Sequence, residues 1–171
     1  SDDEFHPQRF EMCMNAFEKD GDIDFISTWL NIVDEKSRLK GVKEAWRNMH
    51  PWKIKNKNLS SSDSDDYMLN TLMANFVGTT SNMIFKRKVY EKIGGMRNLR
   101  FAHDWDFVLR VCSKFKCYNF KKALLSYRVH GKNTITSNKK WMLFEICWVL
   151  AANIDKFTEK LMPNFSSNRL G

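Results

Sequence analysis

Residues 23–33 constrain the fold more than any other stretch, because they alternate as a strand does and yet carry apolar side chains on both faces. Phe25 belongs to one face and Ile26 to the other. A strand of this kind must be covered on both sides. Apolar residues at helical spacing occur before it, at residues 10–17, and after it, at residues 107–115. Helices that alternate with strands predict an α/β fold.

The remaining elements are predicted from periodicity and turn residues, and residues 1–171 are expected to form one domain. The basic residues 36–57 are interrupted by Pro51 and are expected to be irregular, apart from a short helix at 44–49. Residues 163–171 are expected to be a frayed tail. Further helices are expected at 67–75, around 89–93 and at 139–157, and further strands at 83–85, 117–120 and 124–129.

The composition is that of a globular protein, with 43% hydrophobic residues and a net charge of +8. This charge suits nucleic acid, an anionic membrane surface or a phosphorylated small molecule, although charge alone favours a merely solvated basic surface. The four cysteines lack the paired spacing of a metal site, which favours a reducing compartment. We therefore expect a cytoplasmic protein, with peripheral membrane association as an option. The apolar stretch 141–152 contains Glu145 and is too short to span a bilayer.

Three polar clusters could carry chemistry: Asp2-Asp3, His103-Asp104-Trp105-Asp106 and Arg128-Val-His130-Gly-Lys132. Asp104 lies in the first turn of a predicted helix, where free N–H groups favour a carboxylate, either as a reactive group or as a plain N-cap. Arg128 and His130 share a face at the end of a predicted strand, with Lys132 nearby. Such a group suits a phosphate or a metal–phosphate complex, and it equally suits an ordinary charged surface.

The order of these clusters, with the segments between them, resembles the second half of a family 2 glycosyltransferase. The resemblance covers most of the chain, and its five pieces occur in the right order and spacing. The segments that carry it are Ser1-Asp2-Asp3 with His6-Pro7-Gln-Arg-Phe10, Asp22-Ile-Asp-Phe-Ile-Ser-Thr28 with Ile32-Val-Asp-Glu35, Gly78-Thr-Thr-Ser-Asn82 with Phe85-Lys-Arg87 and Ile93-Gly-Gly-Met96, Ala102-His-Asp-Trp-Asp-Phe107 with Leu109-Arg110, and Tyr127-Arg-Val-His130 with Asn133.

The resemblance implies a GT-A fold, with a partial Rossmann-like sheet and flanking helices, and inverting transfer of a sugar from a nucleotide donor to an acceptor hydroxyl. Asp104 would be the general base. Asp2 and Asp3, with His130, would hold a divalent metal, Mn²⁺ or Mg²⁺, on the donor diphosphate. His130 would also neutralise charge on the departing nucleoside diphosphate. The residues expected to contact donor or acceptor are Thr80, Ser81, Asn82, His103, Trp105, Arg128 and Lys132; for Trp105, stacking on a sugar and an inward core position are equally expected.

Two departures from the family pattern modify these expectations. The family usually has Glu before the catalytic Asp, whereas this chain has His103, which could hydrogen-bond a sugar or alter the choice of acceptor. The family's nucleotide-binding half also precedes the acidic motif. We therefore expect the chain to be a C-terminal fragment that is inactive alone, binds nucleotides weakly, and pairs an exposed sheet edge with another copy.

The sequence also has features of three other classes of protein. A glycoside hydrolase needs two carboxylates around one sugar, but Asp104 and Asp106 diverge by roughly 200° on a helix. A non-catalytic basic module would bind nucleic acid or an anionic polymer, although the basic residues are not interleaved with aromatics in a recognised pattern, so nucleic acid is not expected as a partner. A scaffold could use the apolar helix at 141–152 as an interface, and that helix also suggests a homodimer.

Overall fold

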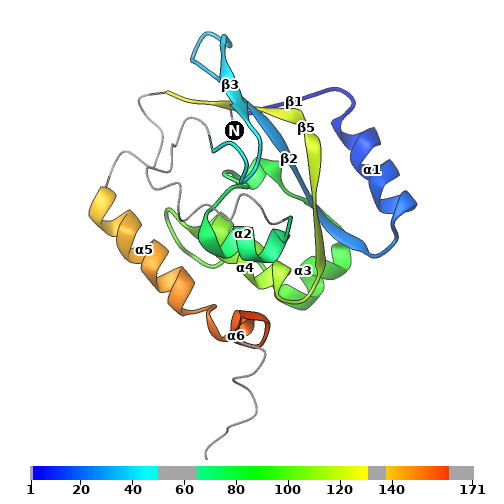
Figure 1. Ribbon diagram of the computed structural model, residues 1–171. Helices are drawn as coiled ribbons and strands as arrows, with labels where there is room; N and C mark the ends of the chain where they lie inside the picture. The colour runs from blue at the N-terminus through cyan, green and yellow to red at the C-terminus, as the bar shows by residue number, and fades with distance from the viewer. Residues whose placement is uncertain (1, 50–64, 131–137, 162–171) are drawn as a thin grey trace, which may run out of the picture.

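The computed structural model describes residues 2–49, 65–130 and 138–161, and it contains a mixed sheet with helices on both faces (Figure 1). The strand order is β1 (Glu4–Phe5), β5 (Lys116–Arg128), β2 (Ile23–Val33) and β3 (Leu39–Lys43), and β4 (Ile84–Phe85) pairs with another stretch of β2. The central pair β2–β5 is parallel, whereas the other pairings are antiparallel. The α/β class predicted from the sequence is confirmed.

Helices cover the sheet in layers. Helix α1 packs on one face, α2 and α4 pack on the other beside α3, and α5 and α6 pack on the far side of α4 (Figure 1). The bounds of the helices are Arg9–Lys19 for α1, Tyr67–Met73 for α2, Arg87–Ile93 for α3, His103–Cys112 for α4, Lys139–Ala151 for α5 and Asp155–Leu161 for α6. A 3₁₀ turn, η2, spans Thr80–Asn82.

Strand β2 is buried on both faces, as its sequence predicts. Phe25 packs into the cluster formed with α2, α3 and α4, while Ile26 packs against Cys13 and Phe17 of α1. Both side chains are fully buried. Because β2 pairs with β5 on one edge and with β3 and β4 on the other, it anchors the sheet on which the functional segments are carried.

The prediction for residues 36–49 of the basic stretch was wrong, and residues 50–57 lie outside the described residues. Residues 39–43 form strand β3, paired with residues 30–33 of β2, and residues 44–49 form turns and irregular backbone rather than a helix. Among the described strands, β3 is the last in the order β1-β5-β2-β3, and its first two residues, Leu39 and Lys40, are exposed. Lysines are common on such edge strands because they discourage further pairing, and their presence obscured the strand pattern.

Two predicted boundaries were also wrong. The two strands predicted at 117–120 and 124–129 are one strand, β5, which ends at Arg128 and has an irregular register where Phe120 and Ala123 pair with consecutive residues of β2. The extra residues of this bulge, Lys121 and Lys122, are exposed. In the sequence, two adjacent lysines between apolar stretches look like a turn between two strands. The long C-terminal helix ends at Ala151 and resumes at Asp155, because the side chain of Asn153 turns inward onto α4.

Helix α4 ends at Cys112, before the last apolar residue of the predicted pattern, Phe115. Phe115 lies beyond the helix and packs against the same core. The predicted tail at 163–171 lies outside the described residues. In the parts of the chain that the structure describes, no helix is both long enough and apolar enough to cross a membrane.

Candidate functional site

The first acidic pair lies beside the end of the last strand. Strand β1 pairs with β5 through Glu4 and Ser126, so the residues before β1 meet those that follow Ser126. Asp3 Oδ1 accepts the backbone N–H of Arg128 at 3.4 Å, and Asp2 Oδ2 lies 2.9 Å from His130 Nε2. Two of the three clusters identified in the sequence are therefore in contact.

Arg128 holds a loop rather than projecting freely. Its guanidinium donates to the carbonyl of Asp34 at 2.9 Å and to Ser37 Oγ at 3.0 Å, and it pairs with Glu4 at 2.6 Å. The side chain is only 13% exposed. These contacts fix the turn after β2 against β1, so the observed contacts of the Arg128 side chain are those of a structural support. Lys132 lies outside the described residues.

The segment 78–82 connects the acidic pair to the start of α4. Thr79 Oγ1 donates to Asp3 Oδ2 at 3.2 Å, and Thr80 Oγ1 lies 3.3 Å from His103 Nε2. The sequence singled out Thr80 and His103, and the structure brings them together. It did not single out Thr79, which touches the acidic pair directly and which no local pattern distinguishes from its neighbour.

Ser81 and Asn82 anchor this segment to the sheet. The buried Asn82 side chain accepts the backbone N–H of Thr28 at 3.0 Å and donates to the Thr28 carbonyl at 2.9 Å. The Ser81 carbonyl accepts a hydrogen bond from the buried guanidinium of Arg9 at 3.1 Å, and Arg9 also donates to Thr28 Oγ1. Both residues were predicted to contact substrate, but their observed contacts are those of structural supports.

Asp104 is buried at the start of α4, with 7% of its surface exposed. The N-cap is Ala102, so the interpretation of Asp104 as a plain N-cap was wrong. Its Oδ1 accepts the backbone N–H of Trp105 at 2.7 Å, and its Oδ2 accepts the side-chain amide of Asn75 at 3.2 Å. Asn75 in turn accepts the N–H of Gly78 at 3.1 Å. Asn75 therefore joins the carboxylate to the segment that contacts Asp3.

Lys43, at the end of β3, is a second buried charge near Asp104 that the sequence did not reveal. It is 1% exposed and donates to the Asn75 carbonyl at 3.2 Å. Burial lowers the pKa of Lys43 to about 8, although the negative charge of Asp104 opposes that change. Gly78 has φ of 80°, and a Cβ there would lie 2.8 Å from Lys43 Nζ, so glycine suits both the backbone and the space.

Lys43, Asn75 and Gly78 border a cavity of about 250 Å³ between β3, α4 and α5, and Asp104 is joined to its wall through Asn75. Asn75 and Lys43 form the polar part of its wall, and α5 contributes apolar residues. The lining residues are Lys43, Met49, Asn75, Gly78, Phe101, Ala102, Trp105, Met142 and Ile146. A larger groove of about 820 Å³ lies between α1 and the start of β5, and among the described residues none of the predicted site residues lines it.

Trp105 lies in the core, as one of its two expected positions required, and does not form an exposed surface for stacking on a sugar. Its surface is 8% exposed, its Nε1 donates to the Thr71 carbonyl at 2.7 Å, and it packs with Leu109 and Val149. Only part of the indole borders the cavity. The geometry is therefore that of a core tryptophan rather than of an open stacking platform.

The donor atoms at the acidic pair suit a divalent cation in kind. Asp2 and His130 offer a carboxylate oxygen and an imidazole nitrogen at one place, and the Asp2 side chain is 52% exposed. Within residues 2–49, 65–130 and 138–161, no three His, Cys, Asp or Glu side chains form a ready cluster for a metal. Asp3 follows directly in the chain, and a bound diphosphate or water commonly supplies further ligands to Mg²⁺.

No family model matches the chain, and no curated protein matches its sequence. Function is therefore inferred from the motifs of the sequence and from the contacts between them.

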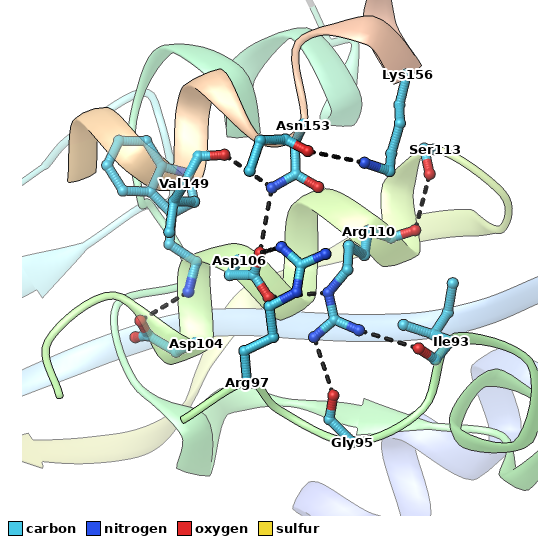
Figure 2. Close-up of polar contacts among 12 residues, drawn as sticks. Ile93, Gly95, Arg97, Asp104, Asp106, Arg110, Ser113, Val149, Asn153 and Lys156 are labelled. Atoms are coloured by element: carbon cyan, nitrogen blue, oxygen red, sulfur yellow. Dashed lines mark hydrogen bonds and ion pairs between the residues drawn. The ribbon is translucent and has the colours of Figure 1, made fainter. Parts of the chain in front are cut away.

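Asp106, two residues beyond Asp104, is the centre of a buried charge network (Figure 2). Its carboxylate accepts hydrogen bonds from Arg97 and Arg110, each at 2.9 Å, and from Asn153 at 3.2 Å. Figure 2 shows Asp104 directed away from this network. The two carboxylates point apart, as their spacing on a helix predicts, and Asp106 fixes α4.

Proposed function

We propose that the chain forms the catalytic and acceptor-side part of an inverting, metal-dependent glycosyltransferase of the GT-A type. It would transfer a sugar from a nucleotide-sugar donor to the hydroxyl of a glycan or another acceptor in the cytoplasm. The supporting observation is a continuous path of contacts from Asp104 through Asn75 and residues 78–79 to Asp3 and the end of β5. It joins the same three clusters that carry the resemblance.

In the proposed reaction, Asp104 takes the proton of the acceptor hydroxyl as that oxygen attacks the anomeric carbon. The new carbon–oxygen bond forms as the bond to the diphosphate breaks, and the configuration inverts. Each oxygen of Asp104 accepts one N–H, from Asn75 or from the Trp105 backbone, which fixes the carboxylate and leaves further lone pairs for the hydroxyl. Burial beside a cavity limits competition from water.

The remaining residues would act on the donor and on the orientation of the acceptor. Asp2, Asp3 and His130 would hold Mn²⁺ or Mg²⁺, which when bound neutralises charge on the donor diphosphate. Thr80 and His103, which are in contact with each other, would present hydrogen-bonding groups to a sugar hydroxyl. The buried Lys43, which donates to the carbonyl of Asn75, would help to hold the Asn75 side chain against Asp104.

A screen of nucleotide-sugar donors with Mn²⁺ tests the proposal, using the chain extended at its N-terminus to include the nucleotide-binding half that the resemblance implies. Asp104→Asn should lower kcat by a factor on the order of 10²–10⁴ with little change in donor affinity. Asp22→Asn, at an exposed carboxylate before β2, serves as the control and should retain activity. Near-unchanged transfer by Asp104→Asn would refute the assignment, and salt-sensitive DNA binding without transfer would favour the basic-module alternative.

A further inference from the structure

The outer face of α5 is apolar from Trp141 to the end of the helix. Between Trp141 and Ala151 every exposed side chain is hydrophobic, and the single charged residue, Glu145, is buried. Surface helices normally carry polar residues on the side that faces solvent. The exposed fractions of the large side chains are 51% for Trp141, 57% for Leu143, 56% for Phe144 and 40% for Trp148.

The orientation of this helix is fixed from its inner side. Val149 packs with Trp105 and Leu109 of α4, and Glu145 accepts the backbone N–H groups of Phe101 and Ala102 at 2.7 and 3.1 Å. A rotation of α5 that hid the outer face would break these buried contacts. Figure 1 shows α5 at the periphery, on the side of the molecule away from α1. The apolar face is therefore held outward.

Cationic groups lie near both ends of this face, although one of them, Arg97, also pairs with Asp106. Lys139 and Lys140 are exposed at the start of α5, and the Arg97 guanidinium lies 5.4 Å from the centre of the Trp148 ring. Asp155, beyond the end of the helix, is exposed and lies 3.6 Å from the ammonium of Lys156. The whole chain carries a net charge of +8. An isologous contact between two copies would bring these cationic rims together, which disfavours self-association through this face.

We propose that the outer face of α5 docks on an anionic lipid bilayer, with the helix lying in the plane of the interface. Tryptophan, phenylalanine and leucine flanked by basic residues are the composition of interfacial helices. The 13 residues of α5 are too few to cross the hydrocarbon layer. The opposite side of α5 lines the cavity through Met142 and Ile146, so a docked chain holds that cavity about one helix diameter, ~10 Å, from the lipid surface.

The test is flotation of the full chain with phosphatidylcholine vesicles that contain or lack phosphatidylglycerol, at low and high salt. Binding should require the anionic lipid, weaken with salt and shift tryptophan emission to the blue. The double variant Phe144→Gln/Trp148→Gln should lose vesicle partitioning by about ten-fold or more. Phe10→Gln, which removes an aromatic ring that is 68% exposed on α1, is the matched control and should bind like the unaltered chain.

A second variant tests the charge component and does not depend on the aromatic residues. Lys139→Gln/Lys140→Gln should weaken binding to anionic vesicles by about five-fold for each lysine. Absence of binding, or binding that both double variants retain, overturns the proposal. A concentration-dependent dimer seen by sedimentation velocity, abolished by Phe144→Gln/Trp148→Gln and unaccompanied by vesicle binding, overturns it in favour of a second copy. None of these measurements involves a sugar donor, so the outcome is separate from that of the proposed activity.

Discussion

Asp106 offers the sharpest test of how this chain supports its candidate site. The substitution Asp106→Asn keeps the size of the side chain and removes its charge. The carboxylate is fully buried and is bound by Arg97, Arg110 and Asn153. An amide would retain one acceptor oxygen, but its NH₂ group would face another donor, so at least one charge-assisted hydrogen bond is lost.

The loss of stability expected for Asp106→Asn depends on the contacts that Arg97 and Arg110 retain in the variant. Breaking a buried ion pair by removing one partner costs about 3–5 kcal/mol. Arg97 has a side chain that is 39% exposed and can be solvated, whereas that of Arg110 is 9% exposed and keeps only the carbonyls of Ile93 and Gly95. Because both arginines retain partial compensation, we expect the lower end, about 3 kcal/mol. This is a large share of the ~5–15 kcal/mol by which proteins are usually stable.

Urea denaturation followed by tryptophan fluorescence measures this loss, since urea is uncharged and leaves ion pairs unscreened. With a slope of about 2 kcal/mol/M, the midpoint should fall by about 1.5 M. Glu91→Gln is the control, because it removes the exposed pair between Glu91 and Arg87 and should change stability by no more than about 0.5 kcal/mol. If Asp106→Asn unfolds at the same urea concentration as this control, the network does not carry the stability inferred for it.

Two further predictions concern buried charges around the cavity. Between pH 8 and 10.5 the unfolded chain binds more protons at Lys43 than the folded chain, because burial lowers the pKa of Lys43 to about 8, so its contribution to stability rises with pH. Over this pH interval, the free energy of unfolding of the unaltered chain should rise by about 3 kcal/mol relative to that of Lys43→Met in urea titrations. A difference in free energy of unfolding that does not change with pH would contradict burial as the cause. The pKa of Glu145 is lowered overall, because hydrogen bonds from the N–H groups of Phe101, Arg100 and Ala102 outweigh the opposing effect of burial. The ionised Glu145 therefore stabilises the fold above the unfolded pKa of 4.5, and this contribution is lost as the pH falls below that value. Glu145→Gln should therefore cost about 1–2 kcal/mol at pH 7 and progressively less in acid, whereas a cost that persists at low pH would show that Glu145 acts through packing alone.

The parts of the fold that the sequence predicts are those fixed by local periodicity. Strand β2 has the predicted bounds, since its two apolar faces leave no other arrangement, and α1 follows the predicted apolar spacing. Strand β3 was missed because its stability depends on pairing with β2, which no local pattern records. The break after α5 was missed for the same reason, because it depends on the contact of Asn153 with Asp106.

The candidate site divides in the same way. The sequence identifies Asp104 and the acidic pair because motifs of charged residues are visible in one dimension. It does not identify Asn75 or Lys43, which stand in stretches without a motif and acquire their roles only when β3 and the turn after α2 meet the start of α4. Their environment is created by tertiary packing, and a lysine in a basic stretch looks solvated until its burial is known.

The short sequence His103-Asp104-Trp105-Asp106 serves three purposes because successive residues of a helix point about 100° apart. Asp104 binds Asn75, Trp105 fills the core between α4 and α5, and Asp106 fixes the helix through two arginines. The residue that would do chemistry is therefore held by its own immediate neighbours. A substitution at Trp105 or Asp106 should displace Asp104 without touching it, so activity losses at these positions are informative only when stability is measured on the same variants.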